Sequence, residues 1–114
     1  MNANAASASV AALEALLAAG KDGALLRFGL GNAYLSSGDP TRAAEHLQKA
    51  LAFDPEYSAA WKLLGKAFSA SGQEAAALEA YRDGMAAAQK KGDKQAYKEM
   101  QVFARRLAKR LGLE

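Results

Sequence analysis

Cysteine is absent from the 114-residue chain, histidine occurs once, and the only β-branched residues are Val10, Thr41 and Val102. Without cysteine the chain can form no disulfide, no thiolate metal site and no thiol nucleophile. β-Branched residues favour strands, whereas alanine and leucine, which occur 29 and 15 times, are the best helix formers. The composition therefore argues against a sheet and predicts one small all-helical domain with closely packed helices.

Long apolar runs are missing as well. No segment approaches the roughly 18 consecutive apolar residues that a membrane-spanning helix needs, and Glu14 interrupts the apolar stretch near the N-terminus. The first residues also lack the basic segment that opens a secretory signal. From these features we expect a soluble protein with a cytoplasmic location.

The excess of positive charge, +3 in total, is confined to one part of the chain. Residues 1–92 carry nine basic and nine acidic side chains, so this part is neutral as a whole. Residues 93–114 carry six basic and three acidic side chains, which accounts for the entire excess. The sequence therefore predicts a neutral body and one basic terminal segment, not a uniformly basic surface.

An internal repeat with a period of 34 residues runs through the chain, most clearly where Leu30-Gly31 recurs as Leu64-Gly65. Further pairs at the same offset are Ala33-Tyr34 with Ala67-Phe68, Ser37-Gly38 with Ser71-Gly72, Ala43 with Ala77, and Leu13 with Leu47. A fixed period of this length indicates a supersecondary unit that stacks on copies of itself.

Each period has the pattern of a helical hairpin. Between residues 57 and 71 the apolar and small residues recur three or four positions apart, which places them on one face of a helix. Gly72 supplies the left-handed conformation that ends this helix. In the earlier period, Asp39-Pro40 provides an N-cap and a first-turn proline for the second helix, and Pro55 prevents that helix from continuing. Small residues stand where the two helices of a hairpin must approach closely: Gly31, Gly65, Ala43 and Ala77.

This hairpin resembles the tetratricopeptide repeat, a helix–turn–helix unit with the same period. The motif residues in the second period are Trp61, Leu64, Gly65, Phe68, Ala77 and Tyr81, and those in the first are Leu30, Gly31, Tyr34, Ala43, Leu47 and Pro55. Two positions depart from the family pattern, because Arg27 replaces a large apolar residue and Gln89 replaces the closing proline. The second departure predicts that the last helix of the second repeat continues to about Lys91.

The resemblance implies an all-α fold, a tetratricopeptide-like α-solenoid of about six antiparallel helices in one domain, residues 1–114, with a right-handed superhelical twist. We expect an N-terminal capping helix over residues 7–19, repeats over 24–57 and 58–91, and a C-terminal capping helix over 93–111. Solenoids need such caps because a terminal unit otherwise exposes an apolar face. The last helix would dock through an apolar stripe of Ala96, Tyr97, Met100, Phe103, Ala104 and Leu107, opposite a basic face.

In this family the first helix of each hairpin lines a concave groove that holds a peptide. Transferred by position, the groove residues are Leu25, Phe28, Asn32, Leu35, Ala59, Lys62, Lys66 and Ser69. The two lysines lie one turn apart, where they could meet carboxylates, and the asparagine amide could bond a peptide backbone. The resemblance thus implies a scaffold or adaptor that binds a protein or peptide partner, with an acidic or C-terminal segment carrying a hydrophobic anchor as the favoured ligand.

Two other interpretations of these groove residues remain. The lysines are equally consistent with solvated surface residues, and Phe28 with a ring packed under the N-terminal helix. The carboxylate clamp of some tetratricopeptide domains is not expected, because Phe28 and Leu63 stand where that clamp has a lysine and an asparagine.

Basic residues of the last helix form a second candidate surface, consisting of Arg105, Arg106, Lys109 and Arg110. Such a surface could bind the phosphates of nucleic acid or an anionic membrane, which is the alternative function. Nucleic acid and membrane are nevertheless not the expected partners. The nearby aromatic residues lie on the apolar stripe, and basic residues in the last turns also stabilise the helix dipole. A third hypothesis is weak self-association through an incompletely capped edge.

No group of residues predicts catalysis, a cofactor or a metal site. The carboxylates of Glu45, Glu74, Glu79 and Asp83 are spread along the second helices of the repeats. The sequence shows no Ser–His arrangement and no glycine loop that would hold a phosphate. We expect His46 to be a surface histidine, and we expect a non-catalytic protein that uses no cofactor.

Overall fold

The computed structural model describes residues 3–113 of the chain, with the side chains of residues 8–113. This part forms six α-helices, which are α1 Ala3–Ala18, α2 Ala24–Ser36, α3 Pro40–Phe53, α4 Ser58–Ala70, α5 Glu74–Lys91 and α6 Lys94–Arg110. The predicted all-α fold of about six antiparallel helices is confirmed. The first helix differs from the prediction in that it begins at Ala3, earlier than residue 7.

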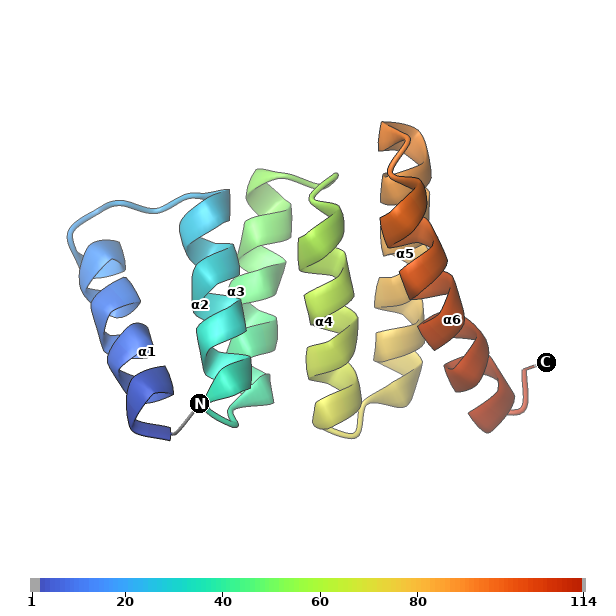
Figure 1. Ribbon diagram of the computed structural model, residues 1–114, viewed down its shortest axis with the longest axis horizontal. Coiled ribbons are helices and arrows are strands. Elements are labelled where there is room, and N and C mark those ends of the chain that lie inside the picture. The colour runs from blue at the N-terminus through green and yellow to red at the C-terminus, as the bar shows by residue number, and fades with distance from the viewer. Residues whose placement is uncertain (1–2, 114) are drawn as a thin grey trace.

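The molecule measures 44 × 28 × 21 Å, and the helices lie side by side along its longest axis (Figure 1). α2 pairs with α3, and α4 pairs with α5, while α3 packs against α4 to join the two hairpins. α2 also contacts α4, and α4 contacts α6, so these three helices form one layer. α3 and α5 lie behind this layer in Figure 1. α1 covers α2 at one end of the array, and α6 covers α5 at the other.

The turns have the chemistry that the sequence predicts. The side chain of Asp39 accepts a hydrogen bond from the backbone N–H of Arg42, with Pro40 in the first turn of α3. The α4–α5 turn passes through Gly72, which has a φ of 78°. α5 continues to Lys91 as expected without a closing proline. The left-handed Gly92 then ends it, at a φ of 76°.

Glycines set the distance between paired helices. A Cβ built on Gly31 would lie 2.5 Å from Cγ of Leu47, and a Cβ on Gly65 would lie 2.5 Å from two ring atoms of Tyr81. Carbon atoms do not approach so closely, so each hairpin can pack as it does only because no side chain is present at these positions. The predicted close contacts are therefore confirmed.

The core divides into two clusters of buried residues. One is built by α2, α3 and α4 together with Ala80 of α5, and the other by α5 and α6, with Trp61 and Phe68 of α4 in contact with both. The indole of Trp61 also donates a hydrogen bond to the carbonyl of Pro55 over 2.8 Å, which ties α4 to the preceding turn. α4 is consequently the element that links the first repeat to the closing helix.

Candidate functional site

The candidate groove residues lie on α2 and α4, two neighbouring helices of one layer. Asn32, Lys66 and Ser69 are exposed, as is Ala59, and the side chain of Leu25 is 77% exposed. The structure thus brings five of these residues to the surface of the α2–α4–α6 layer, where a ligand can reach them.

The other groove candidates are partly buried. Phe28 and Leu35 both pack against the core of the first hairpin. The ring of Phe28 stacks on Tyr57, with 4.9 Å between the ring centroids. Phe28 also lines a largely apolar hollow of about 650 Å³ between α1 and α2, together with Leu16 and Leu25. The contact between Phe28 and Tyr57 means that the junction of α2 and α4 is filled by an aromatic pair.

The junction of α4 and α6 is built differently. Nζ of Lys62 lies 3.2 Å from Oε1 of Glu99 on α6, and both side chains are more than one third exposed. An exposed pair of this kind contributes well under about 1 kcal/mol to stability. Lys66, one turn further along α4, forms no ion pair with any described residue. Of the two groove lysines, Lys66 is thus the more available cation.

Two hollows lie along this junction, and both are lined by Lys62 and Glu99. One measures about 260 Å³ and lies between the start of α4 and the start of α6, next to Ala59 and Gln95. The other measures about 230 Å³ and is lined in addition by Leu63, Lys66, Tyr81 and Phe103. Together the hollows form a groove between α4 and α6, with the ion pair between them.

Tyr81 and Phe103 are members of this groove that sequence reasoning missed. Tyr81 is 3% exposed and its ring lies against Gly65, so it reaches the groove from α5. Burial raises the pKa of Tyr81 to about 12. Phe103 was predicted to dock with the apolar stripe of α6, but it is 39% exposed. It lies at the edge of that stripe, where its ring stacks on Tyr81 at a centroid distance of 5.3 Å.

The predicted basic surface of α6 is exposed, but half of it is engaged within the chain. The guanidinium of Arg106 lies over the ring of Phe103, 5.9 Å from its centroid. Nη2 of Arg110 lies 2.6 Å from Oε2 of Glu74. Among the described residues, Arg105 and Lys109 form no ion pair. A ligand therefore meets two unpaired cations on this surface.

His46 is not the free surface histidine that the sequence suggested, because its side chain is only 14% exposed. Nδ1 accepts a hydrogen bond of 3.0 Å from Nη1 of Arg27, and the ring stacks on Tyr34. Nε2 lies 3.7 Å from a carboxylate oxygen of Glu14 on α1. Arg27 in turn donates two hydrogen bonds, of 2.7 and 2.9 Å, to the carboxylate of Asp22. The polar partners explain how this repeat accommodates an arginine at an apolar motif position.

This cluster shifts the pKa values of its members. Burial and, next, the neighbouring Arg27 guanidinium lower the pKa of His46 below its usual 6.5. The hydrogen bond from Arg27 lowers the pKa of the Asp22 carboxyl. Arg27 at an apolar position could have signalled the need for a buried partner, but the identity of that partner required the fold.

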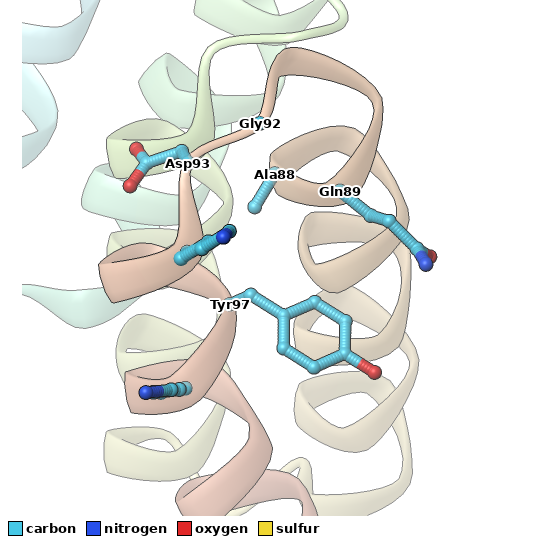
Figure 2. A pocket seen from close by; sticks show the side chains of 7 residues that line it. Ala88, Gln89, Gly92, Asp93 and Tyr97 are labelled. Atoms are coloured by element: carbon cyan, nitrogen blue, oxygen red, sulfur yellow. The ribbon is translucent and has the colours of Figure 1, made fainter.

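Another hollow, of about 350 Å³, lies at the turn between α5 and α6 (Figure 2). Figure 2 shows the ring of Tyr97 extending from α6 towards α5, with Gln89 on the opposite helix. Asp93 at the rim of this hollow serves as the N-cap of α6, since its carboxylate accepts a hydrogen bond from the backbone N–H of Ala96. This hollow is a crevice between two packed helices with a capping residue at its edge.

Neither metal-ligand clusters nor membrane spans are found in the part of the chain that the structure describes. No group of three or more histidine, aspartate or glutamate side chains is gathered as a metal site within that part. In the same part, no helix is both long and apolar enough to cross a bilayer.

Two hairpins that repeat one another, with a helix covering each end, define an α-solenoid of helical repeats. Family models described as the tetratricopeptide repeat match residues 34–101 and residues 2–58. The chain belongs to the tetratricopeptide repeat family, whose domains are generally protein–protein interaction modules and typically non-catalytic.

Known relatives include proteins of similar length. The TPR repeat-containing protein PA0015 of Pseudomonas aeruginosa is 60% identical over 95 residues, which are 83% of this chain and 90% of the relative. The solution structure of protein BPP2914 from Bordetella parapertussis has a TM-score of 0.78 and 50% identity, covering 92% of this chain and 91% of the other. The crystal structure of the Sgt2 TPR domain from Aspergillus fumigatus also has a TM-score of 0.78, with 27% identity, over 96% of this chain and 70% of the other.

Proposed function

We propose that this protein is a non-catalytic scaffold or adaptor that binds a peptide segment of another protein along the α2–α4–α6 layer. The observation that supports this proposal is the groove between α4 and α6, which combines an apolar floor with lysines at its rim. The two hollows, of about 260 and 230 Å³, are smaller than the roughly 300–1,000 Å³ of pockets that enclose a small ligand, whereas a groove between helices can hold an extended or helical segment.

The charges at the Lys66 end of the groove favour an acidic segment, whereas Asp93 and Glu99 line the other end. Lys66 has no partner of opposite charge among the described residues, and Arg106 lies beside the groove over Phe103. On α2, the exposed amide of Asn32 can both donate to and accept from a peptide backbone. An acidic segment with apolar side chains would therefore find cations, an apolar wall and a backbone partner within one layer of helices.

Charge reversal tests this assignment. Short acidic peptides are titrated by fluorescence anisotropy against the wild type and against the double variant Lys62→Glu, Lys66→Glu. We expect the variant to bind at least about tenfold more weakly, equivalent to roughly 1.4 kcal/mol. The matched control reverses two exposed lysines on the other layer, Lys49→Glu and Lys91→Glu, and is expected to keep the wild-type affinity. Equal affinity of the groove variant and the wild type would remove the groove assignment.

Anionic-surface binding by α6 is the second candidate, and the unpaired Arg105 and Lys109 favour it. The probes are a DNA duplex and vesicles containing phosphatidylserine. Binding through these side chains must weaken steeply as salt increases, because each phosphate contact releases counterions. Affinity that is independent of salt would exclude this function.

A further inference from the structure

We propose that the hollow lined by Leu63, Lys66, Tyr81 and Phe103 is a subsite for one glutamate or aspartate side chain within the bound peptide, with the Tyr81 hydroxyl as its hydrogen-bond donor. This proposal rests on the proposed function, since it specifies which chemical group of the peptide the groove selects.

The Tyr81 hydroxyl is the observation that points to a ligand. The residue is only 3% exposed, yet its hydroxyl takes part in none of the side-chain hydrogen bonds among residues 8–113. Among the described side chains, the fully buried polar atoms without a partner are Glu14 Oε1 and Ser58 Oγ, so the Tyr81 oxygen is accessible. Because Tyr81 also lines the hollow, its hydroxyl is available to an acceptor that enters there in place of water.

The charges around this donor favour an anionic acceptor. Lys62 and Lys66 line the hollow, and Arg106 is held over the Phe103 ring at its edge. Glu99 is the acidic residue of the lining and neutralises Lys62, so a positive balance remains. The Tyr81 hydroxyl is protonated at neutral pH, as at the ordinary tyrosine pKa of about 10, and can therefore donate. Hydrogen bonds from a neutral donor to a carboxylate are stronger than those to a neutral acceptor.

The apolar walls favour a side chain over a terminal carboxylate. Leu63 and the exposed edge of Phe103 can contact the methylene groups of a glutamate and an apolar neighbour in the peptide. The volume of about 230 Å³ suits one side chain.

Three acetylated peptides test the subsite by NMR, which measures weak binding and locates it. The first is acetyl-Leu-Glu-Leu-amide, the second is its glutamine counterpart, and the third is the glutamine peptide with a free C-terminal carboxylate. Each is titrated against the wild type, against Tyr81→Phe, and against the matched control Tyr97→Phe. The aromatic signals of Tyr81 and Phe103 report whether the peptide occupies the hollow.

We expect the glutamate peptide to shift both aromatic signals in the wild type, and Tyr81→Phe to weaken its binding roughly tenfold. The glutamine peptide should bind at least about tenfold more weakly and should respond less to Tyr81→Phe. Tyr97→Phe should leave every affinity unchanged.

Any of three results would overturn the subsite: equal binding of the glutamate and glutamine peptides, no effect of Tyr81→Phe, or a preference for the free C-terminus. If these occur while the groove lysines still determine binding of longer acidic peptides, only the subsite is wrong. If the lysine variants also bind like the wild type, the proposed function is wrong as well.

Discussion

Replacing Gly65 by alanine should destabilise this protein, although alanine is the better helix former. Alanine gains about 1 kcal/mol over glycine in a helix interior. At Gly65, however, the new Cβ would lie 2.5 Å from Cε1 and Cζ of Tyr81. The ring cannot simply move away, because it is buried and stacked on Phe103. Overpacking of this kind costs about 1–3 kcal/mol, which offsets the gain in helix propensity and leaves an expected net loss of up to about 2 kcal/mol.

Gly29 provides the matched control for Gly65. It also lies inside a helix, but the nearest atom to its new Cβ would be Cδ1 of Leu13 at 3.6 Å, an ordinary contact. Gly29→Ala should therefore stabilise the protein by about 0.5–1 kcal/mol. Urea and thermal unfolding monitored by circular dichroism measure both effects, with about 4 °C in Tm for each kcal/mol in a domain of this size.

The contact with Tyr81 can be separated from other effects of Gly65→Ala. In a Tyr81→Ala background the clash is absent, so Gly65→Ala should become stabilising, as it is at Gly29. A Gly65→Ala variant that gains stability as Gly29→Ala does would refute the argument that this glycine sets the distance between α4 and α5. An equal loss in the Tyr81→Ala background would place the cause elsewhere.

Three further perturbations have defined outcomes. His46 has a lowered pKa in the folded state, so the unfolded chain binds more protons; stability is complete above about pH 6.5 and falls as the pH drops below this value. Urea unfolding at pH 7.5 and 5.5 should show this loss in the wild type and a smaller one in His46→Gln. Asp93→Ala removes the N-cap of α6 and should cost about 1 kcal/mol in the same assay, and a loss near zero would contradict the capping role. Glu99→Gln frees Lys62 and removes a negative charge from the groove, so acidic peptides should bind more tightly in anisotropy titrations, and weaker binding would count against the groove.

Much of the fold could be predicted because the repeat encodes it locally. Asp39-Pro40 and Gly72 act within one turn of the chain, and the Leu-Gly pairs place a small residue where the two helices of each hairpin meet. These features recur with the fixed period of the repeat, so the structure of one hairpin predicts that of the next. Even the longer α5 followed from a single missing proline at Gln89.

The groove and the polar cluster could not be predicted in the same way, because each depends on a helix outside the two repeats. His46 is held by Arg27 of α2 and faces Glu14 of α1, two residues that the repeat pattern does not pair with it. Phe103 has the spacing of a core residue, but the way α6 packs on α5 leaves its ring at the edge of the interface, stacked on Tyr81. Periodicity assigns a residue to a face of its helix, whereas the depth of burial depends on the neighbouring helix.

One repeat position differs between the two junctions in a way that bears on the groove. Phe28 and Lys62 are separated by one full period of the repeat and therefore occupy the same place on α2 and α4. At the first junction this place is filled by the stack of Phe28 on Tyr57. At the second junction it holds the exposed pair of Lys62 and Glu99, with a hollow on either side. An aromatic pair closes a junction between helices, whereas an exposed ion pair of low stability can exchange partners with a ligand. The replacement of phenylalanine by lysine within an otherwise repeated framework thus puts an exposed ion pair where the first junction has a packing contact, and under the proposed function an acidic ligand would compete there with Glu99.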